Sequence, residues 1–372
     1  MSGQRILALV TDAFGGYGGI AQYNRDLFTA LSASAVVDDL VVLPRMAPEQ
    51  PGTLPAKIRQ APAVAGRIAY SLAAVRHALS SRPTIVLCGH LFHINLARLI
   101  AGLTGAKLVV QLYGLDIWSD VAPARRRALE SADLILTISR DTRSHVRAKT
   151  SIDPTKIVIL TTTVSDEFRP GDRAAARAHF GLGDELAILT VSRLDMSSDH
   201  KGHDRIIPLI AVLRDAGVPV VYLVAGVGAY QKVLEDLVCQ HGVERNVRFL
   251  GYIQREDQPD LYRAADIFAL PSTGEGFGIV FTEAMACGTP AIGLAVGGAP
   301  DALGDGELGI CVAPEAFADA FLAMASTPIE RDLTLADRVR ARFGFPVFCS
   351  QVDTIIQTLA ATPTDASKGN GG

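Results

Sequence analysis

The sequence has little of what defines several specialised classes of protein. Its 372 residues include five cysteines and no C-x-x-C pair, which argues against a disulfide framework or a zinc ribbon and favours a reducing compartment. No apolar run reaches the ~18 residues of a membrane-spanning helix, and the apolar run at 6–10 is too short for a signal peptide. The 34 glycines follow no collagen-like repeat. Because 49% of the residues are hydrophobic, we expect a folded globular protein. The cysteine usage and the short N-terminal apolar run lead us to expect it in the cytoplasm.

Acidic residues are missing from one long stretch. None occurs between Gln50 and Leu115, where seven basic residues stand. Residues 1–165 hold 18 Lys and Arg against 11 Asp and Glu, whereas the remainder holds 17 against 28. A basic half beside an acidic half suggests that the first half meets something anionic, such as a phosphorylated acceptor or a membrane surface.

Short apolar segments alternate with amphipathic segments of helical period along the chain. Helices are expected between the strands, for example at 20–32, 62–80 and 278–287, and two or three helices close the chain. The pattern predicts strands at 5–11, 39–43, 84–88, 107–112, 134–138, 157–160, 187–191, 220–225, 247–250, 267–270, 291–294 and 309–312.

Two segments interrupt this alternation. Residues 44–61 contain four prolines and predict a loop or a lid, and residues 165–185, with mixed charge and several Gly and Pro, predict an interdomain linker. The alternation on both sides predicts two doubly wound α/β halves with parallel sheets. The expected divisions are domains 1–165 and 166–345, a helix at 346–360 that packs back on the first domain, and a disordered tail at 361–372.

A glycine loop, Gly15-Gly16-Tyr17-Gly18-Gly19, follows the first strand and precedes a helix. Glycines there let backbone N–H groups approach a phosphate, although the run is not a G-x-G-x-x-G. Asp38 and Asp39 follow at about the distance of the ribose-binding acid of a dinucleotide fold. The loop is therefore a candidate phosphate or sugar contact, with a plain turn as the alternative.

Histidines and one acid follow the next strands. His90 stands directly at a strand end, where site residues collect, and His93 follows at i+3. Two such histidines can bind a metal, but no carboxylate lies nearby in sequence, so we expect no metal site. Asp116, in Tyr113-Gly114-Leu115-Asp116, is the first acid after the acid-free stretch. It either orients His90, contacts a hydroxyl or caps the following helix.

The sharpest motif contains two carboxylates. In the segment 271–290, Glu275 lies in a glycine-rich turn and Glu283 lies within a helix that Gly288 ends. The pair fits either a glycosidase acid/base couple or two hydroxyl-binding carboxylates, against a purely structural alternative with Glu283 at the surface. Arg193 and Lys201, in a loop after a strand, are a weaker signal for a diphosphate site.

These motifs together resemble a retaining glycosyltransferase of family 4, the "glycosyl transferases group 1" type with the GT-B fold. The resemblance rests on E-x7-E in EGFGIVFTEAMACGTP, VSRL, KG, VAGVG, VRFLGY, GGYGGIA and the position of His90. It implies two Rossmann-like domains facing each other across a cleft, the first binding the acceptor and the second the nucleotide sugar. Tyr113-Gly114 departs from the His-Gly of many relatives.

The resemblance also implies residue roles. The diphosphate of the donor would be held by Arg193 and Lys201, and the ribose hydroxyls by Glu283. The donor sugar would be held by Glu275 with the backbone N–H groups of Phe277 and Gly278. The remaining implied positions are Ile279 among the donor contacts, Gly16 near the phosphate or acceptor, His90 near the reacting sugar, and the backbone near Tyr252 for the base.

The expected activity is metal-independent, retaining transfer of a hexose from a UDP-glucose-type or GDP-mannose-type donor. The expected acceptor is a glycan or a polyprenyl-diphosphate-linked saccharide in polysaccharide or envelope synthesis. We expect no cofactor and no nucleic acid, and we expect contact of the basic segment 57–107 with an anionic membrane surface at the inner face of the plasma membrane. The alternatives are a nucleotide-sugar epimerase, a nicotinamide-dependent dehydrogenase and a non-catalytic sugar-nucleotide-binding protein.

Overall fold

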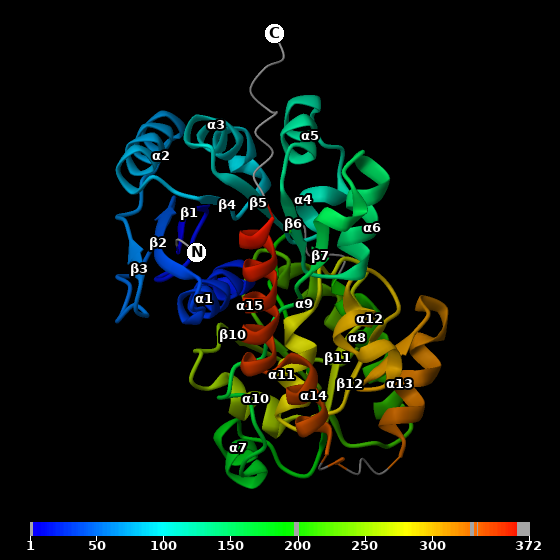
Figure 1. The fold of residues 1–372 in the computed structure, drawn as a ribbon. Helices are drawn as coiled ribbons and strands as arrows, with labels where there is room; N and C mark the ends of the chain where they lie inside the picture. Colours follow the sequence, from blue (N-terminus) through cyan, green and yellow to red (C-terminus); the bar gives the residue numbers. More distant parts are fainter. Residues whose placement is uncertain (1–2, 197–200, 328–330, 333, 363–372) are drawn as a thin grey trace. The chain divides into compact units, whose positions relative to one another are not determined.

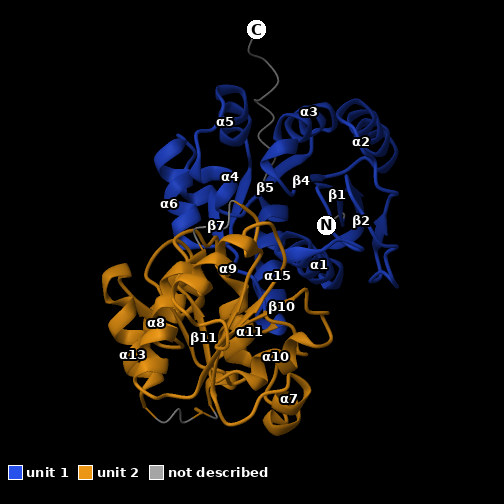
Figure 2. Cartoon of the chain, turned by 180° about the vertical axis from the view of Figure 1, so that it is seen from behind, with its two compact units in different colours: residues 1–163, 345–372 blue, residues 164–344 orange. Residues whose placement is uncertain are grey.

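The chain divides into two compact units. The computed structural model describes residues 3–196, 201–327, 331–332 and 334–362, so the expected tail lies outside the described residues from 363 onward. Unit 1 comprises residues 1–163 and 345–372, and unit 2 comprises residues 164–344 (Figure 2). In each unit a parallel sheet is covered by helices, which confirms the predicted fold class.

Unit 1 is built on a seven-stranded parallel sheet in the order β3-β2-β1-β4-β5-β6-β7. The strand order reverses beside β1, because β2 pairs with one edge of β1 and β4 with the other. The strands are β1 (Gln4–Val10), β2 (Val37–Pro44), β3 (Ile58–Gln60), β4 (Ile85–Cys88), β5 (Lys107–Leu112), β6 (Leu134–Thr137) and β7 (Ile157–Ile159).

Helices cover both faces of this sheet, because a strand that must return parallel needs a crossover. Helices α2 and α3 pack against one face in a common apolar core, and α1 and α15 pack against each other on the opposite face (Figure 1). The helical segments are α1 (Gly18–Ala33), α2 (Arg67–Ser81), η1 (Leu91–His93), α3 (Ile94–Thr104), α4 (Leu115–Trp118), α5 (Pro123–Glu130), α6 (Arg140–Lys149), η2 (Pro154–Lys156) and α15 (Phe345–Ala361).

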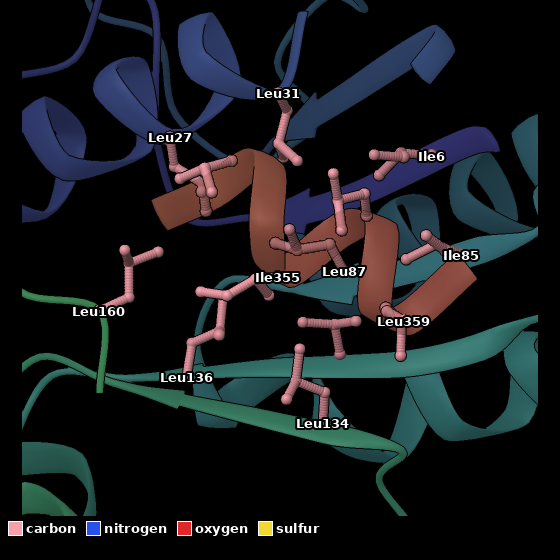
Figure 3. Close-up of a pocket in the computed structure, with 13 residues that line it drawn as sticks. Ile6, Leu27, Leu31, Ile85, Leu87, Leu134, Leu136, Leu160, Ile355 and Leu359 are labelled. Atoms are coloured by element: carbon pink, nitrogen blue, oxygen red, sulfur yellow. The ribbon is translucent and has the colours of Figure 1, made fainter. Parts of the chain in front are cut away.

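The last helix, α15, completes the core of unit 1 although it is far from that unit in sequence. Figure 3 shows Ile355 and Leu359 of α15 among apolar side chains from α1 and the strands, including Leu27, Leu31 and Leu87. The lining is entirely apolar, so the hydrophobic effect holds the helix on the sheet.

Unit 2 repeats the design with a six-stranded parallel sheet in the order β10-β9-β8-β11-β12-β13. The order reverses beside β8, which pairs with β9 and β11. The strands are β8 (Leu186–Val191), β9 (Val220–Ala225), β10 (Val247–Gly251), β11 (Ile267–Leu270), β12 (Ala291–Leu294) and β13 (Ile310–Val312). The helical segments are α7 (Arg173–His179), α8 (His203–Asp215), α9 (Gln231–Gln240), α10 (Gln258–Ala264), α11 (Ile279–Ala286), α12 (Ala299–Ala302), η4 (Gly304–Gly306), η5 (Pro314–Ala316), α13 (Phe317–Ala325) and α14 (Leu335–Phe343).

One expectation about connecting segments was wrong, and another held only in part. The expected linker at 165–185 belongs to unit 2 and contains α7, which packs on α10. Asp172 caps α7 by accepting a hydrogen bond from the N–H of Ala175 at 3.0 Å, and Phe168 is fully buried. The expected loop is present at 45–57, but the segment also contains the edge strand β3, whose position at the rim of the sheet tolerates the neighbouring prolines.

Among the described residues, no helix is both long and apolar enough to cross a membrane.

Candidate active site

The candidate donor site of unit 2 lies at the carboxyl ends of β8 and β11, the two strands where the order of the sheet reverses. Ligands of doubly wound sheets bind at such positions. Glu275 lies in the loop after β11, and Lys201 precedes α8. Lys201 Nζ lies 2.5 Å from Glu275 Oε1, and the two side chains are only 13% and 12% exposed. The fold thus joins two of the predicted site residues, 74 positions apart, in a shielded ion pair.

A pair of glycines that follows β12 holds the Glu275 loop in place. The N–H of Gly298 donates to the carbonyl oxygen of Glu275 at 2.8 Å. A Cβ atom at Gly298 would lie 2.1 Å from the carbonyl oxygen of Gly276, so only glycine allows this approach. The sequence prediction missed this contact, although the paired glycines after a strand were a usable signal.

Helix α11 starts directly after this loop. Gly278 precedes the helix with a φ of 94°, and no side chain among the described residues caps the helix N-terminus. The first N–H groups of any helix lack partners inside the helix, which suits them to a phosphate or another anion. Phe277 is buried, and Ile279 is the first residue of the helix. The predicted backbone contacts therefore lie at an uncapped helix N-terminus beside Glu275.

Glu283 lies inside α11 and is buried, which excludes the surface alternative. Its Oε2 accepts from the Tyr262 hydroxyl at 2.9 Å, and its Oε1 lies 3.4 Å from Arg255 Nη1. Burial raises the pKa of Glu283 to about 7, while Arg255 and the Tyr262 hydroxyl act in the opposite direction. Arg255 also pairs with Glu167 at 2.5 Å and stacks 4.6 Å above the ring of Phe168.

The remaining predicted residues of unit 2 are exposed. Arg193 follows β8, is 72% exposed and pairs with Asp195 at 3.3 Å. Its interactions within the described residues do not include Lys201 or Glu275. Tyr252 follows β10 and is 56% exposed. Their roles stay predictions that rest on the family resemblance.

A buried polar chain fixes the segment that carries Lys201. His203, the first residue of α8, bonds through Nε2 to the Ser192 hydroxyl at 2.9 Å and through Nδ1 to the Tyr222 hydroxyl at 2.8 Å. Tyr222 in turn bonds to Thr190 at 2.8 Å. Burial, and secondarily the charge of Lys201, lowers the pKa of His203 to about 4, so the ring is neutral. This chain was not predicted, because its members share no motif in the sequence.

In unit 1, the glycine loop follows β1 and His90 follows β4, again at the reversal of strand order. His90 Nδ1 accepts from the N–H of Phe92 at 3.2 Å, so the neutral ring carries its proton on Nε2. Burial and the nearby Arg125 lower the pKa of His90. Gly16 is buried, and a Cβ atom there would lie 2.8 Å from Cβ of Asp12.

Asp116 does not orient His90 through any hydrogen bond among the described residues. Its Oδ1 accepts from the N–H of Tyr113 at 3.0 Å, and burial raises its pKa to about 6. Several buried side-chain atoms of this unit have no hydrogen-bond partner within the described residues, and such groups mark places where a ligand or water completes the bonding. They include Asp12 Oδ1, His93 Nε2, both amide atoms of Gln111 and Asp116 Oδ2.

Two other predictions can be compared with this geometry. Asp38 and Asp39 lie at the amino end of β2, opposite the edge where ligands bind, and Asp39 pairs with Arg59 at 2.6 Å. The dinucleotide interpretation of the first glycine loop therefore loses its ribose-binding acid. In the described part of the chain, no group of three His, Cys, Asp or Glu side chains is arranged to hold a metal ion.

Family models match most of the chain in two parts. The model described as "Glycosyl transferases group 1" matches residues 172–339. The model described as "Glycosyl transferase 4-like domain" matches residues 18–162. The two matches fall in unit 2 and unit 1, respectively.

Curated relatives match about half of the chain. D-inositol 3-phosphate glycosyltransferase of Mycobacteroides abscessus is 37% identical over 190 residues, which cover 50% of this chain and 42% of that relative. The protein of the same name from Mycobacterium tuberculosis is 36% identical over 190 residues, covering 50% and 39%. The match therefore spans less than half the length of these relatives.

Solved structures share the fold over nearly the whole chain. The Anabaena HepE protein, in complex with UDP and glucose, has a TM-score of 0.75 at 20% identity, covering 95% of this chain and 100% of that chain. Sucrose-phosphate synthase of Thermosynechococcus elongatus has a TM-score of 0.77 at 23% identity, covering 96% and 100%. At these identities the likeness concerns the fold alone.

Proposed function

Because this chain belongs to the group 1 type of glycosyltransferases and has the GT-B fold, we propose that it transfers a hexose from a nucleotide sugar to an acceptor. The observation that carries this proposal is the shielded Lys201–Glu275 pair beside the N-terminus of α11. A cation and an uncapped helix terminus suit a diphosphate, and the carboxylate suits the hydroxyls of a sugar.

The donor contacts are divided among the residues of unit 2. Lys201, Arg193 and the first N–H groups of α11 stabilise the charge that grows on the diphosphate as its bond to the sugar breaks. In the structure Lys201 is paired with Glu275, so a bound donor contacts both side chains, with its diphosphate at Lys201 and its sugar at Glu275. Glu283 accepts hydrogen bonds from the ribose hydroxyls, and the backbone near Tyr252 contacts the base.

The proposed reaction is retaining and needs no metal ion, because the cations come from side chains. The acceptor oxygen attacks the anomeric carbon on the face that the diphosphate leaves. The bond from that carbon to the diphosphate oxygen breaks, and a phosphate oxygen takes the proton of the acceptor. Gly16 and His90 contact the acceptor side of the reacting sugar.

The donor is of the UDP-glucose or GDP-mannose type. The complexes of HepE with UDP and with UDP-glucose favour the first, although they show only the shared fold. For the acceptor we propose a glycan or a polyprenyl-diphosphate-linked saccharide in polysaccharide or cell-envelope glycan synthesis. The name of the curated relatives gives a second candidate, a phosphorylated cyclitol. The basic balance of residues 1–165 suits either anionic acceptor.

The test is a transfer assay in EDTA, with UDP-glucose and GDP-mannose as donors and either an inositol phosphate or a polyprenyl-diphosphate saccharide as acceptor. We expect one donor to yield product whose new linkage keeps the anomeric configuration of the donor, as read by proton NMR. Inversion of configuration would contradict the retaining mechanism. Tight donor binding with neither transfer nor donor hydrolysis would favour a non-catalytic sugar-nucleotide-binding protein, and formation of an epimerised donor would favour an epimerase.

A further inference from the structure

Helix α2 of unit 1 carries an apolar stripe on its outer side. Ile68, Leu72 and Leu79 are 79%, 68% and 70% exposed. Their spacing, with the half-buried Val75 between them, places them on one side of the helix. The opposite side of α2 supplies the side chains that pack into the core, Tyr70, Ala74 and Ala78. The core therefore does not account for the outer stripe.

The neighbouring helix α3 carries a second stripe. Leu99 and Leu103, one turn apart, are 55% and 67% exposed. Helix α3 packs against α2, and Figures 1 and 2 show the two helices side by side, α2 beside β1 and β2 and α3 beside β4 and β5. Exposed apolar residues scattered singly are ordinary, but five of them on two helices that contact each other suggest an interaction surface.

The charged residues of these two helices are of one sign. Both helices lie inside the stretch between Gln50 and Leu115 that has no acidic residue. Arg67, Arg76 and Arg98 are exposed on the two helices. Among the described residues, none of these three arginines forms an ion pair with a carboxylate. An apolar face with arginines and no acids is the composition of helices that lie in the interface of an anionic membrane.

We propose that this α2–α3 face, made of Ile68, Leu72, Leu79, Leu99, Leu103 and the adjacent arginines, docks unit 1 on an anionic lipid bilayer. The apolar side chains enter the boundary between headgroups and acyl chains, and the arginines contact the lipid phosphates. Charge selects this occupant over a second copy of the chain, since two such faces would oppose arginine to arginine. The inference does not depend on the proposed donor or acceptor.

The test is co-sedimentation of the full chain with vesicles, without any substrate. Vesicles of phosphatidylcholine with a third of phosphatidylglycerol are compared with pure phosphatidylcholine at rising salt. We expect binding only to the anionic vesicles, weakening with salt because the arginine contacts are screened. Arg76→Gln and Arg98→Gln should each lower the partition coefficient about fivefold. Leu72→Ser and Leu79→Ser should each lower it about tenfold or more.

Matched variants away from the face keep the test specific. Val212→Ser and Val233→Ser remove half-exposed apolar side chains of unit 2, and Arg147→Gln removes an exposed charge on α6. These controls should bind like the wild type, and circular dichroism should show all variants folded. Absence of salt-sensitive binding to anionic vesicles overturns the proposal, as does equal loss in the controls. Self-association in sedimentation velocity that Leu72→Ser abolishes, without vesicle binding, would assign the face to a second copy instead.

Discussion

Removal of the Lys201 charge tests how much the Lys201–Glu275 pair contributes to the stability of unit 2 and how much it contributes to turnover. The variant Lys201→Met keeps much of the side-chain volume and deletes the ammonium group. It leaves the carboxylate of Glu275, only 12% exposed, without its cation. Breaking a buried pair in this way costs about 3 kcal/mol, the lower end of the range for fully buried pairs. For a unit of this size that corresponds to a fall in the melting temperature of roughly 6–10 °C.

The same change should also slow the reaction. Loss of one strong stabiliser of the charge on the leaving diphosphate costs about 10²-fold or more in turnover. The double variant Lys201→Met/Glu275→Gln removes both charges, so it should regain most of the lost stability because no unpaired carboxylate remains. Its turnover should stay at least 10²-fold below that of the wild type.

The assays are thermal unfolding and initial rates of donor consumption at saturating donor. Lys232→Met is the matched control, because Lys232 is exposed on α9 and pairs with Asp236 at 3.0 Å in solvent. It should change neither the melting temperature nor the turnover measurably. Turnover of Lys201→Met within about threefold of the wild type would refute the role given to Lys201. Recovery of turnover in the double variant would show that the pair matters only for folding.

Four further outcomes follow from the site. The pKa of Glu283 is raised to about 7 from its usual value near 4.3, so between these pH values the folded state binds a proton that the unfolded state has lost. The free energy of unfolding should therefore fall as pH rises through this range. Urea unfolding at pH 5 and pH 8 tests this, and Glu283→Gln should reduce the dependence of the free energy of unfolding on pH. Donor affinity should change in the opposite direction, rising through pH 7, because an ionised Glu283 is the better acceptor for ribose hydroxyls; a flat calorimetric affinity between pH 6 and 8 would count against that contact. Gly298→Ala should destabilise unit 2 by about 1–3 kcal/mol and weaken donor binding, because its Cβ meets the carbonyl of Gly276, whereas Gly52→Ala, with open space around it, should do neither. EDTA should leave turnover unchanged and Mg²⁺ should raise it less than twofold; a strict metal requirement would contradict the proposed mechanism.

The sequence predicted the strands well, because buried parallel strands are short apolar runs between turn residues. The runs 107–112, 220–225, 267–270 and 291–294 coincide with β5, β9, β11 and β12. Position after a strand selected Glu275 and His90 as site candidates, since doubly wound sheets bind ligands there. Lys201 was a weak signal by itself, and its role came from the family resemblance.

What the sequence did not predict depends on contacts between distant residues. The glycine support of the Glu275 loop and the His203 hydrogen bonds arise only when separate strand ends meet. The segment 165–185 was misjudged because its Gly and Pro content outweighed the capping signal of Asp172. Glu283 contacts Arg255 and Tyr262. Both lie outside the recognised motif and were not selected.

The central claim is that unit 2 binds a nucleoside diphosphate through Lys201 and α11, with Glu283 on the ribose. The most direct measurement is calorimetric titration of the protein with UDP, GDP, ADP and NAD in EDTA, in parallel with Glu283→Ala and with Glu315→Ala as an exposed control. We predict tight binding of one nucleoside diphosphate that is lost in Glu283→Ala and kept in Glu315→Ala. Binding of NAD alone, or of none of the four, would contradict the account.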